Sequence, residues 1–167
     1  NRIILKAKTF ALPELQFRSL LNGTVVQERD TAVEELGDMK VVTNVAPAKS
    51  DVDDLIFANK VVKHCKSNAI VLAKNGQLFA SGIGQTSRVD SLKQAIEKAK
   101  SFGFSLEGAV LASDAFFPFA DCVEIAHKEG IRSVIQPGGS VRDNDSIEYC
   151  DANGLAMVFT GVRHLKH

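Results

Sequence analysis

The sequence predicts an α/β domain of three layers, in which helices cover both faces of a mostly parallel sheet. Helical and extended segments alternate along the chain from Ser50 onward. The later extended segments are continuously apolar, which is typical of strands that are buried on both faces. A length of 167 residues, 45% of them hydrophobic, suits one ordinary domain with a sizeable core.

The first 49 residues are expected to form strands and a connection, before an α/β domain at residues 50–167. Residues 2–8 have strand character. Residues 17–30 are expected to form two extended segments that break at the turn pair Asn22-Gly23. The acidic and poorly periodic residues 31–40 indicate a surface connection, and the β-branched residues 41–45 indicate a short strand.

The α/β domain is expected to open with a helix and a hairpin. Ser50 and Asp53 resemble the capping pattern of a helix start. Residues 69–73 and 77–81 flank Asn75-Gly76, which predicts two strands joined by a tight turn. The first helix presents one apolar face, formed by Leu55, Ala58, Val62 and Cys65.

The second helix has the clearest periodicity in the chain. Asp90 lies at its start, and Gly103 follows it as a stop signal. Beyond it we expect two more helices, near residues 119–126 and 143–151, and three strands, at residues 108–112, 133–136 and 155–159. The apolar residues of the second helix recur at helical spacing and are Leu92, Ala95, Ile96, Ala99 and Phe102.

The charge balance argues against nucleic acid and membranes as partners. Lys+Arg and Asp+Glu each number 20, and no basic run stands out. No apolar stretch approaches the roughly 20 residues that cross a bilayer. Cys65, Cys122 and Cys150 are odd in number and far apart, which favours reduced thiols in a cytoplasmic protein. The chain opens at Asn1 rather than Met, which we expect of a cloned or processed piece.

Polar residues and glycines gather where predicted strands begin or end, and ligands bind at the carboxyl ends of strands in open α/β sheets. Asn68 could orient a planar amine or amide, or could simply cap the preceding helix. Gly82 and Gly84 permit close backbone approach, and Arg88 could pair with a carboxylate. A plain tight turn with a surface arginine explains these three residues equally well.

An aromatic loop lies between Asp114 and Asp121. Its side chains must pack on something, since exposing each ring costs about 1.5–3 kcal/mol relative to burial. They form either core or an apolar wall for a flat ligand, with Asp121 as the polar anchor of that ligand. The apolar residues of the loop are Phe116, Phe117, Pro118 and Phe119.

Three further features are open to more than one interpretation. Gly138 and Gly139 form a strand-to-helix loop that would let a ligand approach the backbone. The basic tail at residues 160–167, which contains Arg163, is either solvated or placed at the same edge of the sheet. Lys63-His64 lies within a helix without an evident carboxylate partner, and we interpret it as a surface pair.

In order along the chain, these segments resemble the transformylase region of a bifunctional purine-biosynthesis family. That family joins aminoimidazole-carboxamide ribotide (AICAR) formyltransferase to IMP cyclohydrolase, and the resemblance spans essentially the whole chain. The matching strings are KSNAIVLAKNGQ at 66–77, GIGQTSRVDS at 82–91, ASDAFFPFADCVEIA at 112–126, IQPGGSVRD at 135–143 and GLAMVFTGVRHLKH at 154–167.

The resemblance implies a cytidine-deaminase-like fold and, in a homodimer, transfer of a formyl group from 10-formyl-tetrahydrofolate to the AICAR amine. It implies that Asn68 holds the amine and helps the transfer, and that Phe116 and Arg163 belong to the nucleotide site. The implied folate site comprises Arg88, Phe116, Phe117, Pro118, Phe119, Asp121, Gly138 and Gly139. The implied ligands of a potassium ion are Ser67, Asp114, Leu165 and His167.

Some features depart from the family pattern. Its catalytic Lys-His pair belongs to an upstream motif, the cyclohydrolase domain is absent, and Ala80 and Ala120 stand where relatives often have Gly and Arg. We expect the isolated chain to fold but to have negligible activity, because an amide cannot accept the proton that leaves the amine.

Three other functions compete with this interpretation. The chain could be a separate non-catalytic subunit that completes a partner's site, or a plain folate- or nucleotide-binding domain. A zinc deaminase is excluded, because the P-C-x-x-C string of that class does not occur.

Overall fold

The chain divides into two compact units, Asn1–Ala32 and Val33–His167, in a computed structural model that describes residues 2–166. The first unit contains an antiparallel hairpin of β1 (Leu15–Leu20) and β2 (Gly23–Glu28), as the turn pair predicts. Residues 2–8 form no regular element, so the strand expected there is wrong. Within the described part of this unit, β1 and β2 pair only with each other. Residues 2–8 therefore have no neighbouring strand with which to form backbone hydrogen bonds.

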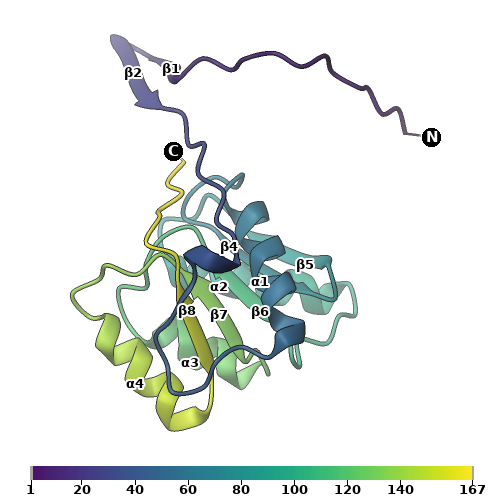
Figure 1. Ribbon diagram of the computed structural model, residues 1–167, viewed down its shortest axis with the longest axis vertical. Helices are drawn as coiled ribbons and strands as arrows, with labels where there is room; N and C mark the ends of the chain where they lie inside the picture. Colours follow the sequence, from purple (N-terminus) through teal and green to yellow (C-terminus); the bar gives the residue numbers. More distant parts are fainter. Residues whose placement is uncertain (1, 167) are drawn as a thin grey trace. The chain divides into compact units, whose positions relative to one another are not determined.

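The second unit holds a six-stranded sheet in the order β3-β8-β7-β6-β4-β5. Figure 1 shows β8, β7, β6 and β5 following one another across the unit. The bounds of the strands are β3 Lys40–Val41, β4 Ile70–Lys74, β5 Gln77–Gly82, β6 Val110–Ser113, β7 Ser133–Gln136 and β8 Ala156–Phe159. The helices are α1 Lys49–Val62, α2 Arg88–Ser101, α3 Asp121–Lys128 and α4 Asp143–Asn153, with a short 3-10 turn at Leu36–Asp38.

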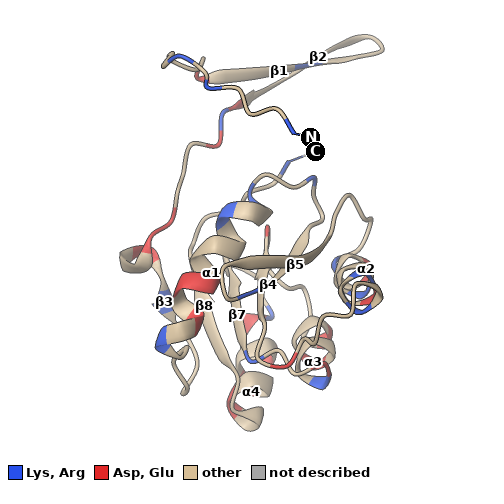
Figure 2. Ribbon diagram, turned by 90° about the vertical axis from the view of Figure 1, so that its right-hand side faces the viewer, with Lys and Arg blue, Asp and Glu red and all other residues tan. Residues whose placement is uncertain are grey.

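The three-layer α/β/α architecture is confirmed. In Figure 2, α1 lies on one side of the sheet, and α2 and α3 lie on the other. Side chains of β4 alternate between the two layers: Ile70 and Leu72 join the core beneath α2, α3 and α4, while Val71 and Ala73 join the core beneath α1. The order of elements after residue 50 is the predicted one.

The sheet is mixed, which corrects the expectation of a mostly parallel one. Two neighbouring pairs, β6/β7 and β7/β8, are parallel, and the other three are antiparallel. One of the antiparallel pairs is β3 with β8. The hairpin accounts for the other two, because it inserts β4 and β5 beside β6 with a reversal at Asn75-Gly76. The carboxyl end of β6 therefore lies next to the start of β4, where Ile70 pairs with Ser113.

The boundary between the units also differs from the expected domain boundary at residue 50. β3 pairs with β8, and Val45 bridges to Ala156, so residues 33–49 belong to the α/β unit. The expected surface connection at 31–40 includes Glu34, which is buried and accepts a hydrogen bond from Asn59 of α1 at 2.8 Å.

Two helix starts differ from the expected caps. α1 begins at Lys49 behind Ala48, and Ser50 bonds its neighbour Asp51 instead of capping the helix. For α2 the cap is Ser87, whose Oγ accepts a hydrogen bond from the Asp90 amide at 3.1 Å. Phe102, expected on the buried face, lies just beyond the helix end and is 64% exposed.

Candidate functional site

A pocket of about 380 Å³ lies at the end of the sheet where β6 ends and β4 begins. Its wall combines four segments: the residues just before β4, the start of α2, the loop after β6 and the C-terminal segment. Its lining residues are Asn68, Thr86, Ser87, Arg88, Ala115, Phe116, Pro118, Arg163 and Leu165. Six of the predicted site residues are thus brought together: Asn68, Arg88, Phe116, Pro118, Arg163 and Leu165.

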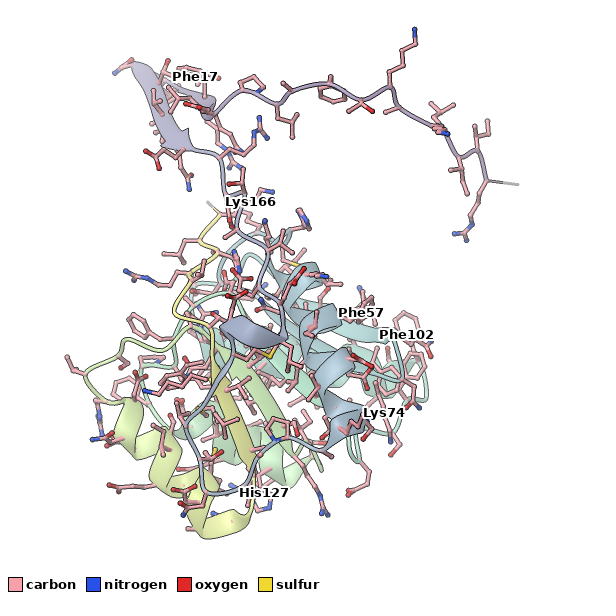
Figure 3. The ribbon with its side chains drawn as sticks, in the orientation of Figure 1. Phe17, Phe57, Lys74, Phe102, His127 and Lys166 are labelled. Carbon is pink, nitrogen blue, oxygen red and sulfur yellow. The ribbon has the colours of Figure 1, made fainter. Side chains whose placement is uncertain are left out.

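The C-terminal segment is tied to this pocket by backbone hydrogen bonds and is not a solvated tail. The Ser67 amide donates to the carbonyl of Lys166, and the Lys166 amide donates to Ser67 Oγ, both at 2.8 Å. The amide of His164 donates to the carbonyl of Asp114 at 2.9 Å. Figure 3 shows Lys166 and His127 at opposite ends of the α/β unit, so the segment lies at the pocket end of the sheet. These bonds hold Arg163 and Leu165 at the pocket wall.

Arg88 forms the polar floor of the site. Its guanidinium is buried and pairs with Asp114 Oδ1. It also donates to Ser113 Oγ at 3.1 Å, to the carbonyl of Ala69 at 3.2 Å and to Asn68 Oδ1 at 2.8 Å. Arg88 is therefore neither the surface arginine of a plain turn nor a freely extended side chain.

Asn68 does not act as a helix cap. It lies six residues beyond the end of α1 and immediately before Ala69, the residue that precedes β4. Its Nδ2 donates to the carbonyl of Gln85 at 3.0 Å, while its Oδ1 accepts from Arg88. The half-buried amide thus has a fixed orientation at the pocket wall.

The aromatic loop divides between pocket, core and surface. Phe116 lines the pocket, with the guanidinium of Arg163 5.7 Å from the centre of its ring, a cation–π distance. Phe117 is fully buried in the core beneath α2, α3 and α4, so its side chain is not exposed at the pocket. Phe119 is half exposed outside the pocket, with the guanidinium of Arg142 4.8 Å from its ring centre.

Asp121, Gly138 and Gly139 lie outside the pocket lining. Asp121 is the first residue of α3, and its Oδ1 accepts from the Cys122 amide at 2.8 Å. Gly138 has a positive φ of 72°, and an added Cβ would lie 2.5 Å from the Phe159 ring. The Gly139 amide donates to Asp143 at 2.7 Å. The geometry of Gly138 thus shows close packing on the Phe159 ring.

The residues implied as potassium ligands are only partly described. Ser67 and Asp114 are buried, Leu165 lines the pocket, and His167 lies outside the described residues. Asp114 Oδ2 is buried without a hydrogen-bond partner among the described residues. No group of three or more His, Cys, Asp or Glu side chains within residues 2–166 could hold a metal ion.

Sequence reasoning missed a buried polar cluster that supports the C-terminal segment. His164 Nε2 lies 3.0 Å from Glu34 Oε2, which also accepts a hydrogen bond from Asn59. All three side chains are buried. Their positions are 25 to 130 residues apart along the chain, so no local pattern relates them. Lys63 is buried as well, while His64 is exposed, so the surface-pair interpretation is wrong for Lys63.

Sequence comparison identifies the family. The family model described as "AICARFT/IMPCHase bienzyme" matches residues 1–98, which include Asn68 and Arg88. The chain belongs to the AICARFT/IMPCHase bienzyme family. The bifunctional purine biosynthesis protein PurH of Bacteroides thetaiotaomicron is 66% identical over 167 residues, which are all of this chain and 33% of that protein. PurH of Aquifex aeolicus is 55% identical over 150 residues, 90% of this chain and 29% of that protein.

The chain thus spans about a third of the length of these AICARFT/IMPCHase relatives. Among solved structures, the dCMP deaminase of cyanophage S-TIM5 matches 63% of this chain and 93% of its own, with 17% identity and a TM-score of 0.47. A deaminase/reductase of Thermotoga maritima matches with a TM-score of 0.41 and 22% identity. No helix within the described residues is long and apolar enough to cross a membrane.

Proposed function

We propose that this chain forms the folate side and part of the nucleotide side of an AICAR formyltransferase site. The reaction would transfer a formyl group from 10-formyl-tetrahydrofolate to the AICAR amine, in a cytoplasmic homodimer. The observation that carries the proposal is the juxtaposition, in a member of the AICARFT/IMPCHase family, of a fixed amide, an aromatic ring and an arginine around one pocket. The amide, the ring and the arginine each suit one part of the two substrates.

The amide of Asn68 suits the amine and carboxamide of AICAR. An asparagine amide has two N–H donors and an oxygen with two lone pairs. Arg88 and Gln85 each engage one of these, so one donor and one lone pair remain for a substrate. Arg163, at the rim beside Phe116, suits a phosphate, because a guanidinium binds phosphate through paired hydrogen bonds.

The apolar residues of the pocket suit the flat pterin of a folate. Phe116 and Pro118 form one wall with Ala115 beside them. Asp121, Phe119, Gly138 and Gly139 lie outside this pocket and would extend the folate site beyond it. Phe117 would support the loop from the core rather than contact the ligand.

The lining chemistry also supports the proposal that the chain needs further residues for turnover. The AICAR amine is a weak nucleophile because its lone pair is delocalised, so its attack needs a base, and the leaving folate nitrogen needs an acid. None of the nine described lining residues has a side chain that exchanges a proton near neutral pH. We therefore propose that a Lys-His pair outside this chain supplies that step.

A potassium ion fits the residues that would hold it. Asp114 Oδ2 is a buried carboxylate oxygen without a hydrogen-bond partner among the described residues, and Ser67 Oγ and the Leu165 carbonyl could add neutral oxygens. Burying an unpaired polar oxygen is costly, and a bound cation would relieve that cost. The ion would supply structural charge compensation at the base of the C-terminal segment.

Substituting Asn68 tests this proposal in the complete gene product that carries the sequence. Formyl transfer is followed as the AICAR-dependent formation of tetrahydrofolate. Asn68→Ala should lower kcat by about 100-fold, the loss expected when an oriented polar group at the reacting atoms is removed. Asn153→Ala is the matched control, since that amide bonds the carbonyl of Tyr149 within α4, away from the pocket. An Asn68→Ala protein that keeps wild-type kcat would refute the assigned role.

A further inference from the structure

Arg88 directs its hydrogen bonds into the protein rather than toward the pocket. Nη1 pairs with Asp114 and donates to Ser113 Oγ and the Ala69 carbonyl, while Nη2 donates to Asn68 Oδ1. Both side chains of the Arg88–Asp114 ion pair are nearly inaccessible to solvent. To clamp a folate carboxylate with both nitrogens, Arg88 would have to release Asp114 and Asn68, leaving a buried charge without its partner.

The bond from Arg88 determines which way the Asn68 amide points. Oδ1 accepts from the guanidinium at 2.8 Å, and Nδ2 donates to the Gln85 carbonyl at 3.0 Å. Rotating the amide by half a turn would place its NH2 group against the guanidinium and its oxygen against the carbonyl oxygen. Both contacts would then be repulsive, so the two partners select one orientation.

The support behind Arg88 is itself rigid. Asp114 Oδ1 accepts from the Ala69 amide at 3.1 Å as well as from Arg88, which fixes the carboxylate to the start of the sheet. Ser91 Oγ, one turn along α2, donates to the Asn68 carbonyl at 2.8 Å. Ser91 of α2 therefore holds the backbone of Asn68, and Arg88, which Asp114 fixes in turn, holds its side chain.

We propose that Arg88 is a positioning residue that fixes the orientation of the Asn68 amide and polarises it. A hydrogen bond from a cation draws electron density from the amide oxygen, and the remaining Nδ2–H becomes a stronger donor toward the pocket. The proposal deepens the formyltransferase assignment and rests on it for its kinetic test. It replaces the direct folate contact that the sequence resemblance implies for Arg88.

The kinetic test compares Arg88→Lys with the wild type in the complete gene product. Lysine keeps a positive charge beside Asp114, but its single ammonium cannot reproduce the fork that also reaches Asn68. We expect kcat to fall by about 10- to 100-fold and KM for 10-formyl-tetrahydrofolate to change by less than about threefold. In an Asn68→Ala background, Arg88→Lys should change kcat by less than about twofold, because its effect passes through Asn68.

Two kinetic outcomes would overturn the proposal. A raised KM for the folate with an unchanged kcat would show that Arg88 binds the cosubstrate directly. An undiminished loss of kcat in the Asn68→Ala background would show that Arg88 acts independently of Asn68. Arg132→Lys is the matched control, since that guanidinium pairs with Glu107 and is 70% exposed, and it should leave both constants unchanged.

A spectroscopic measurement decides the matter even if Arg88→Lys does not fold or the wild type shows no formyl transfer. The probe is the side-chain amide of Asn68 in the wild-type complete gene product labelled with ¹⁵N-asparagine, assigned by its loss in Asn68→Ala. The bond to the Gln85 carbonyl predicts that one Nδ2 proton exchanges slowly with solvent while the other exchanges faster. Rapid exchange of both protons would overturn the positioning role, whatever the enzyme assay shows.

Discussion

Cys122 is a residue whose environment makes it a weaker acid. It is fully buried on α3, and burial, helped by the nearby Asp121 charge, raises the pKa of its thiol to about 12 from the ordinary 9.0. Burial likewise raises the pKa of Cys150 to about 12, and burial also raises the pKa of Cys65. None of the three cysteines is paired in a disulfide in the structure.

The raised pKa of Cys122 predicts a loss of stability in alkali. The folded chain keeps the thiol proton where the unfolded chain releases it, so the stabilising contribution is complete below pH 9.0 and is lost between pH 9.0 and about 12. The free energy of unfolding, measured in urea on both sides of pH 9.0, should therefore fall as pH rises. The fall should be smaller in Cys122→Ala, and an identical pH dependence in the two proteins would contradict the assigned pKa.

For individual residues, the sequence predicted which of them lie at the site better than it predicted what each of them does there. The aromatic loop is recognisable as a candidate, because three phenylalanines and a proline cannot all stay in solvent. Which of them lines the pocket depends on the path of an irregular loop. Such a loop has no helical or strand periodicity from which that path could be predicted. Phe116 and Pro118 line the pocket, while Phe117 joins the core. Arg88 bonds to Asn68 and Asp114, and no local sequence pattern links either of them to Arg88.

At the scale of elements, β5 and α2 approach each other unusually closely. An added Cβ at Gly82, the last residue of β5, would lie 1.8 Å from the backbone oxygen of Ser91 in α2. Backbone cannot yield as a flexible side chain does, so the helix and the strand would have to separate. The same contact holds Ser91 where it bonds the carbonyl of Asn68.

Gly82→Ala should therefore destabilise the α/β unit by about 3 kcal/mol, at the upper end of overpacking costs. The free energy of unfolding in urea gives the measurement. Gly37→Ala is the matched control, because no atom lies within 4 Å of an added Cβ there and φ at that glycine is not positive. Equal stability of the two variants would mean that the β5–α2 contact is looser than described.

Sequence patterning predicted the elements beyond residue 50 because helical and strand periods are local. It failed for the strand at residues 2–8 and for the mixed sheet, since both depend on which strand lies next to which. It also missed Glu34, because an acidic connection carries no sign that one of its carboxylates meets His164 and Asn59 in the interior.

At the scale of the whole molecule, the chain presents a built but partial site. The pocket gathers an oriented amide, an aromatic wall and a rim arginine, yet its described lining offers no group that exchanges a proton near neutral pH. The chain spans about a third of its AICARFT/IMPCHase relatives. Formyl transfer would therefore need residues outside these 167, brought to the pocket by the rest of the protein or by a partner.

The most direct test measures formyl transfer from 10-formyl-tetrahydrofolate to AICAR by the complete gene product and, in parallel, by residues 1–167 alone. The intact mass of the expressed protein, compared with its reading frame, defines the first sample. We expect turnover in the range of about 1–1,000 s⁻¹ for a complete enzyme and none above background for the 167 residues. Turnover by the 167 residues alone, or its absence from a complete gene product that contains the upstream Lys-His motif, would contradict the account.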